Sequence, residues 1–216
     1  ILEDLFLVLS TKEKEVIIKR FSLSSEPRQT LEKIGQSFSV TRERVRQIEK
    51  IALTKLRRTA ENTKLSTIHD IGREFLKANG NMWREDELIS EILKAIASNE
   101  MVDGYIARLA LAISPDFERV EKNLTFNPFW VLKPLAFKDA QAICNAVFGV
   151  LKKKKDIVNE HDLVEEVAEY LKEKEKSYAP ETIKSCLAFD KRFKVTSDGV
   201  GLAEWRHINP KSIRDK

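Results

Sequence analysis

Long hydrogen-bonding side chains crowd the beginning of one short stretch, residues 41–58. Arg42, Glu43, Arg46 and Gln47 would occupy the first two turns of a helix that starts near residue 41. Arginine forms paired hydrogen bonds with guanine, glutamine with adenine, and glutamate accepts a hydrogen bond from cytosine. These residue types at this spacing predict recognition of DNA base edges. The alternative is a charged helix face that only contacts solvent.

Positive charge is concentrated in the same stretch. Between residues 41 and 58, seven Arg and Lys side chains oppose only Glu43 and Glu49, whereas the whole chain has a net charge of +4. The rest of the chain is therefore close to neutral, and the expected attraction for phosphates is local. The positive residues are Arg42, Arg44, Arg46, Lys50, Lys55, Arg57 and Arg58.

Two helices joined by a tight turn are needed to position these side chains. Leu31 and Ile34 lie three residues apart on one face of a short helix, for which Thr30 is a good N-cap. The pattern breaks at residues 36–39. Apolar residues then recur at helical spacing, which predicts a longer second helix and a helix-turn-helix motif. These residues are Val45, Ile48, Ala52 and Leu56.

Two further helices are expected before this motif. Residues 1–9 form an amphipathic pattern whose apolar members are Leu2, Leu5, Phe6 and Leu9. Ser10 and Glu13 then have the spacing of a capping box for a helix over residues 11–21. The four helices together predict a domain over residues 1–62.

The segment VTRERVRQIE, followed by ALTKLR, resembles region 4 of primary bacterial sigma factors, and LSTKEKEVIIKRFSL resembles the first half of that region. The resemblance covers roughly residues 1–60 and implies recognition of a −35-like promoter element. Residues 22–29 depart from the family, which usually has a Gly-containing turn there. The implied base contacts are Arg42, Glu43, Arg46 and Gln47, and the implied DNA backbone contacts are Thr30, Leu31, Arg44 and Lys50.

The resemblance also implies contact with the flap of the RNA polymerase β subunit. Leu2, Leu5, Phe6 and Leu9 are the candidates for this contact, and packing in the domain core is the equally weighted alternative. No segment of these residues is suited to recognise or melt a −10 element. We therefore do not expect this chain to act as a complete sigma factor.

The remaining sequence contains an internal repeat with a period of about 75 residues. FLKANGNMWREDELISEIL at positions 75–93 aligns with VLKKKKDIVNEHDLVEEVA at positions 150–168. Each copy has the pattern of three helices followed by a β-hairpin, which is typical of a winged helix. The predicted fold is thus mainly α: an N-terminal helix-turn-helix four-helix domain followed by two tandem winged-helix (α+β) domains over residues 67–134 and 135–210.

The expected elements of the two copies occupy similar places. In the first copy we predict helices over 67–78, 84–97 and 101–112 and strands near 117–121 and 126–132. In the second copy we predict helices over 137–153, 159–175 and 180–188 and strands over 192–196 and 200–206, with a hairpin turn at Ser197-Asp198-Gly199. The second copy also resembles the HARE-HTH domain and the N-terminal domain of the RNA polymerase δ subunit.

The third helix of each copy lacks the basic face of a DNA-recognition helix. The first copy offers Arg108 beside Asp103, and the second offers Lys184 beside Glu181. The lysine run 152–155 lies at the C-terminal end of a predicted helix, where solvated lysines interact favourably with the negative end of the helix dipole. We therefore expect these two domains to bind proteins or to act as spacers.

The sequence predicts neither catalytic residues nor a metal, cofactor or small-molecule site. His69, His161 and His207 are isolated from one another and from Cys144 and Cys186. Two cysteines among apolar neighbours are typical of buried, reduced thiols in a cytoplasmic protein. No run of residues has the apolar length of a membrane span.

Two functions from different classes follow from these patterns. The first is a sequence-specific DNA-binding transcription factor that also contacts RNA polymerase. The second is a protein-interaction module that docks on RNA polymerase or other proteins, or the DNA-targeting part of a restriction-type protein, since HARE-HTH domains accompany restriction enzymes. The intact set of candidate base contacts favours the first.

The end of the sequence resembles the end of the first repeat. Residues 134–139 (PLAFKD) lead into the first helix of the second copy, and residues 210–215 (PKSIRD) have the same pattern. Ile213 takes the place of Phe137, the first apolar residue of that helix. We therefore expect residues 211–216 to lead into a third winged helix, or a similar helical domain, of a longer protein. The alternative is a short frayed tail that matches by coincidence.

Overall fold

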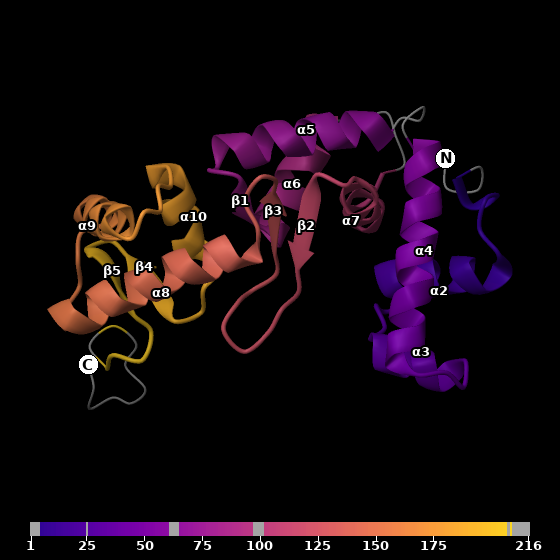
Figure 1. The fold of residues 1–216 in the computed structure, drawn as a ribbon, viewed down its shortest axis with the longest axis horizontal. Coiled ribbons are helices and arrows are strands. Elements are labelled where there is room, and N and C mark those ends of the chain that lie inside the picture. The colour runs from indigo at the N-terminus through magenta and orange to yellow at the C-terminus, as the bar shows by residue number, and fades with distance from the viewer. Residues whose placement is uncertain (1–4, 25, 61–64, 97–101, 207, 209–216) are drawn as a thin grey trace. The chain divides into compact units, whose positions relative to one another are not determined.

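The computed structural model describes residues 5–24, 26–60, 65–96, 102–206 and 208 (Figure 1). The chain divides into two compact units. The first comprises Ile1–Arg73 and Ile89–Pro115, and the second comprises Glu74–Leu88 and Asp116–Lys216. Leu2 and the expected segment 211–216 lie outside the described residues, and the predicted boundaries at residues 62, 67, 134 and 210 stay predictions.

The first unit is built from helices. Three of them, α2 (Thr11–Phe21), α3 (Leu31–Ser37) and α4 (Arg42–Ala60), contact one another, as the sequence predicted for the helix-turn-helix region. Helix α7 (Gly104–Ile113) also packs against α2 and α4. Helices α5 (Leu65–Ala78) and α6 (Glu85–Ile96) each contribute residues to both units.

Local sequence explains where α2 and α3 begin. The Ser10 hydroxyl accepts a hydrogen bond from the Glu13 backbone N–H, and the Glu13 carboxylate accepts one from the Ser10 N–H, so the predicted capping box is confirmed. The Thr30 hydroxyl accepts a hydrogen bond from the Lys33 N–H, as predicted for the N-cap of α3. The predicted apolar stripe is buried at Val45, Ile48, Ala52 and Leu56.

The second unit contains two small antiparallel sheets. Strands β1 (Met82–Arg84), β2 (Phe117–Val120) and β3 (Phe129–Leu132) pair in the order β1-β3-β2. After them come α8 (Phe137–Lys154), α9 (Glu160–Glu173) and α10 (Pro180–Phe189), and then the hairpin of β4 (Phe193–Thr196) and β5 (Gly199–Leu202). The sequence did not predict β1, because three residues are too few to produce a recognisable alternation.

The two copies of the repeat have the same order of elements. Each has three helices followed by an antiparallel hairpin, as the sequence predicted. Val158 forms an isolated bridge with Val200 of β5, so it pairs with the last strand of its copy in the same way that β1 pairs with β3. The predicted strand over 200–206 was too long, because β5 ends at Leu202.

One aromatic cluster holds the second unit together. The rings of Phe129 and Phe189 stack with centroids 3.8 Å apart, and Phe126 meets both rings edge-on. Phe126 forms an isolated β-bridge with Asp190. The last strand of the first hairpin, β3, therefore begins at Phe129, later than the predicted residue 126. Large ring surfaces buried at this point make it a major source of stability for the second unit.

Candidate nucleic-acid interface

The turn between α3 and α4 is tightly packed around Gly35. A Cβ added to this buried glycine would lie 2.7 Å from the backbone oxygen of Val40. The Val40 N–H donates to the Gly35 carbonyl at 2.9 Å, and Ser39 adopts a left-handed conformation with φ of 54°. The absence of a side chain at Gly35 thus lets the chain reverse at this short distance, which sets the direction of α4 relative to α3.

The beginning of α4 is fixed by a cap and by a small core. The Thr41 hydroxyl accepts a hydrogen bond from the Arg44 N–H at 3.2 Å. Val45 and Ile48 are buried with Val16 and Ile34, and Leu31 and Phe38 pack against this cluster from its edge. Because the apolar residues face this core, the intervening residues of α4 must face outward.

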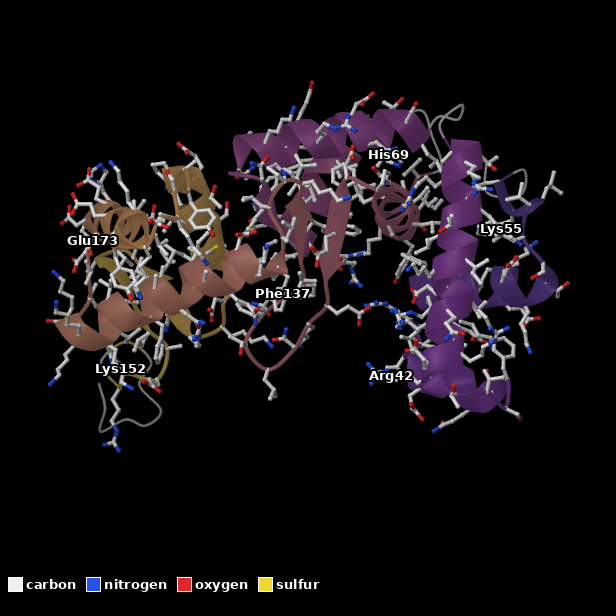
Figure 2. The ribbon with its side chains drawn as sticks, in the orientation of Figure 1. Arg42, Lys55, His69, Phe137, Lys152 and Glu173 are labelled. Atoms are coloured by element: carbon white, nitrogen blue, oxygen red, sulfur yellow. The ribbon has the colours of Figure 1, made fainter. Side chains whose placement is uncertain are left out.

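Six of the eight predicted DNA contacts are exposed on the first two turns and a half of α4. Figure 2 shows Arg42 at the end of α4 next to α3, with Lys55 farther along the helix. Thr30 is also exposed, whereas Leu31 is half-buried against the core. The structure therefore brings the predicted residues to one end of the helix-turn-helix motif. The exposed residues on α4 are Arg42, Glu43, Arg44, Arg46, Gln47 and Lys50.

Four of the candidate side chains pair with one another. Arg46 donates two hydrogen bonds to Glu43, from Nε to Oε2 at 2.8 Å and from Nη2 to Oε1 at 2.6 Å. Arg44 Nη1 donates to Gln47 Oε1 at 3.2 Å. The hydrogen bond from Arg46 lowers the pKa of Glu43, which keeps this carboxylate ionised at neutral pH. The pairs order the side chains while leaving them exposed.

Two long-range ion pairs attach α4 to α2. Arg20 is buried, and its Nε lies 3.1 Å from Glu49 Oε1, while its Nη1 donates to the Gln29 carbonyl at 3.0 Å. Lys55 Nζ lies 2.8 Å from Glu13 Oε2. Sequence reasoning missed both pairs because the partners are 29 and 42 residues apart. They leave fewer free charges on α4 than the sequence suggests.

The C-terminal part of α4 is attached to α7. Arg57 Nε donates to the Ile113 carbonyl at 2.7 Å, and this carbonyl belongs to the last residue of α7. His69 of α5 contacts the Ala110 carbonyl through Nε2 at 2.8 Å. Arg57 is therefore engaged with the C-terminal end of α7, and the six candidate DNA contacts on α4 lie in its N-terminal half.

Leu5, Phe6 and Leu9 are the candidate polymerase contacts that the structure describes. Leu5 is 1% and Phe6 is 6% exposed, and Leu9 is half-buried. This burial agrees with the alternative of core packing for Leu5 and Phe6. The exposed apolar residues of this segment are instead Leu7 and Val8, at 82% and 42%.

Within the described ranges, no group of three or more His, Cys, Asp or Glu side chains is arranged to hold a metal ion. Cys144 and Cys186 are buried and form no disulfide, and the hydrogen bond with Cys186 and burial both raise the pKa of Cys144. None of the helices described here combines the length and the apolar character that a bilayer crossing requires.

Comparison with known proteins identifies the N-terminal segment. Residues 5–58 match the family model Sigma-70, region 4. Over 62 residues, or 29% of this chain, the sequence is 48% identical to RNA polymerase sigma factor SigA1 of Synechococcus elongatus and to RNA polymerase sigma factor SigA of Microcystis aeruginosa and of Synechocystis sp.. The match spans only 16%, 15% and 15% of those relatives, respectively. No solved structure matches the chain. By these comparisons, residues 5–58 are similar to region 4 of sigma-70 factors.

Proposed function

We propose that this chain is a DNA-binding transcription protein that recognises a −35-like promoter element through α4 and associates with RNA polymerase. One observation carries the proposal. In a segment similar to sigma-70 region 4, the hydrogen-bonding side chains on the first two turns of α4 are exposed together, with the apolar stripe of the helix buried behind them. The N-terminal residues of such a helix contact base edges in the major groove.

Each exposed residue has a role in this proposal. Arg42 and Arg46 would donate to guanine, Gln47 would pair with adenine, and Glu43 would accept from cytosine. The Glu43–Arg46 pair is exposed at 58% and 57% of its side chains, and water and salt screen such pairs strongly. Breaking this ion pair to form contacts with bases therefore costs little free energy. The proposed DNA backbone contacts are Thr30, Leu31, Arg44 and Lys50.

The association with RNA polymerase rests on the same similarity. The relatives are named RNA polymerase sigma factors, and their region 4 is the part that this chain matches. For the β flap we retain Leu2, Leu5, Phe6 and Leu9 as the proposed segment. Since Leu5 and Phe6 are buried, the segment would contact a partner through its exposed side chains, Leu7 and Val8, with Leu9 at the edge.

We further propose that residues 67–134 and 135–210 are two winged-helix domains. The shared order of three helices and a hairpin supports this, as does the pairing of Val158 with Val200 in the place of a first strand. Their third helices, α7 and α10, are poor in exposed basic residues. Arg108 of α7 donates back to the Gly104 carbonyl, and Lys184 of α10 is paired with Glu160. We therefore assign these domains to protein contacts or spacing.

A mobility-shift titration tests the DNA-binding proposal. The whole chain is titrated against a duplex that contains a −35-like element and against a duplex of the same length and composition with the element shuffled. We expect the −35-like duplex to shift at a lower protein concentration, by about tenfold or more. Equal shifts for both duplexes, or none, would contradict the proposal and favour the protein-interaction alternative.

A further inference from the structure

Helices α9 and α10 of the second unit lie side by side and pack against each other (Figure 1). Residues of both helices line an apolar groove. The groove has a volume of about 350 Å³. Val164, Ala168 and Pro180 form its apolar lining, and Glu160, Glu165 and Glu181 stand along it. Pockets of this size with an apolar lining and a few polar groups are typical binding sites.

The carboxylates of the groove are only partly neutralised within the described residues. Glu160 Oε1 lies 2.6 Å from Lys184 Nζ. Glu165 has His161 as its neighbour, with Nε2 3.7 Å from Oε1, and both side chains are more than two-thirds exposed. Glu181 has no ion-pair partner among the residues that the structure describes. The groove therefore presents excess negative charge around an apolar lining.

A second cavity, with a volume of about 360 Å³, adjoins the groove. It shares Glu160, Glu181 and Lys184 with the groove and is also lined by Trp83 and Val195. Val195 is 51% exposed, and Trp83 Nε1 donates to Glu87 Oε2 at 2.7 Å, which adds a further carboxylate to this surface. Apolar surface thus lies on both sides of one acidic edge, a pattern that suits an elongated partner.

We propose that this groove binds a basic amphipathic helix of a partner protein, with leucine-like side chains in the apolar lining and Lys or Arg side chains on the carboxylates. Charge complementarity selects this partner, because excess carboxylates repel nucleic acid phosphates and attract lysine and arginine. Helices that place apolar residues at three- and four-residue spacing are a common ligand for apolar grooves. The inference is independent of DNA binding by α4.

Fluorescence anisotropy with designed peptides provides the direct test. The probe is a labelled amphipathic helix of Lys and Leu residues, and two matched peptides replace every Leu with Ser or every Lys with Glu. We expect saturable binding of the Lys/Leu peptide to the whole chain, weakened by salt, and no saturable binding of the other two. No saturable binding of the Lys/Leu peptide, or equal binding of the Lys/Ser peptide, would overturn the proposal.

Variants locate the binding to the groove. Glu165→Lys and Glu181→Lys reverse charges at its edge, and Ala168→Trp fills its lining; each should weaken peptide binding by about tenfold or more. Glu169→Lys makes the same charge change on an exposed residue of α9 that does not line the groove, and it should leave binding nearly unchanged.

Three outcomes of these variants would overturn the proposal. The first is an equal loss of binding in the Glu169→Lys control, which would indicate general charge attraction. The second is undiminished binding in all three groove variants with native circular dichroism spectra. The third is a concentration-dependent dimer in sedimentation that Ala168→Trp abolishes, because a second copy would then occupy the groove. Binding of the −35-like duplex should be the same in Ala168→Trp as in the wild type, which separates this inference from the function proposed for α4.

Discussion

The proposed contacts of α4 with bases compete with contacts that its side chains already make. Arg46 is paired with Glu43, and Gln47 with Arg44, so three of the four candidate base contacts already have a side-chain partner. This arrangement reduces the conformational freedom that long side chains lose on binding. It also means that a change at one member of a pair alters the position of its partner.

The first prediction separates base recognition from phosphate contact. Arg46→Ala and Gln47→Ala should weaken binding to the −35-like duplex by about tenfold to a hundredfold and reduce the preference for that element. Lys50→Ala should weaken binding to both duplexes alike and lower the dependence of affinity on salt concentration. Binding isotherms at several salt concentrations measure both effects. Unchanged affinity and preference in all three variants would show that α4 does not contact DNA.

The second prediction concerns Gly35. Gly35→Ala should lower the free energy of unfolding by roughly 1–3 kcal/mol, because its methyl group would collide with the Val40 carbonyl in the turn. Gly149→Ala is the matched control, since a Cβ added there in α8 would have no atom within 4 Å other than those of its chain neighbours and the nearby backbone of its own helix. That variant should gain about 0.5–1 kcal/mol from helix propensity. Urea denaturation measures the change in the free energy of unfolding of each variant. A change of the same sign in the two variants would contradict the description of the turn.

Among the helices, the orientation of α4 depends on its buried ion pair with α2. The third prediction is that Arg20→Leu lowers the free energy of unfolding by about 3 kcal/mol, because Glu49 and the Gln29 carbonyl lose their partner inside the unit. Lys94→Ala removes an exposed pair with Glu91 and should cost less than about 0.5 kcal/mol. Thermal or urea denaturation measures both variants. Equal losses of unfolding free energy in Arg20→Leu and Lys94→Ala would show that burial of the Arg20 pair has no energetic role.

The fourth prediction is a pH dependence at the start of α2. Burial acts to raise the pKa of Glu13, but hydrogen bonds from Lys55 and Ser10 outweigh it and lower the pKa below 4.5. The folded state therefore gains stability from the ionised carboxylate above pH 4.5, and this gain is lost as the pH falls through the lower pKa of the folded state.

Glu13→Gln should accordingly destabilise the protein by roughly 1 kcal/mol at pH 7, and the difference from the wild type should shrink in more acidic solution. Glu15→Gln, at an exposed position on the same helix, is the control and should have little effect. Urea denaturation from pH 7 to pH 3 measures the trend. A difference that grows in acid would show that Glu13 is not stabilised in its ionised form.

The sequence predicted those parts of the fold that depend on neighbouring residues. Caps at Ser10 and Thr30 and the apolar stripe of α4 are local signals, and the corresponding helices begin close to their predicted positions. The three-residue strand β1 and the pairs of Arg20 and Lys55 depend on residues far away in the chain, and they were not predicted. The exposed face of α4 was predicted because its buried face has a regular period.

For the candidate site, the sequence predicted which residues would be exposed together but not which of them would pair. Pairing of Glu43 with Arg46 depends on side-chain rotamers, which residue types at a given spacing do not determine. Burial of Leu5 and Phe6 likewise depends on the packing of the whole first unit. The −35-like element and the β flap remain proposals drawn from the similarity to sigma-70 region 4.

The whole molecule combines a basic helix-turn-helix segment in one unit with an acidic, apolar groove in the other. The two surfaces suit partners of opposite charge: DNA phosphates for the first and a basic helix for the second. This combination is consistent with α7 and α10 lacking basic faces.

Methylation protection tests the central claim most directly. Dimethyl sulfate methylates N7 of guanine in the major groove, the position that Arg42 or Arg46 would occupy. With the whole chain bound to a duplex containing a −35-like element, we predict protection of guanines within that element, and loss of the protection in Arg46→Ala at a protein concentration that still saturates the DNA. A saturated complex in which every guanine of the element is methylated as in free DNA would contradict the account.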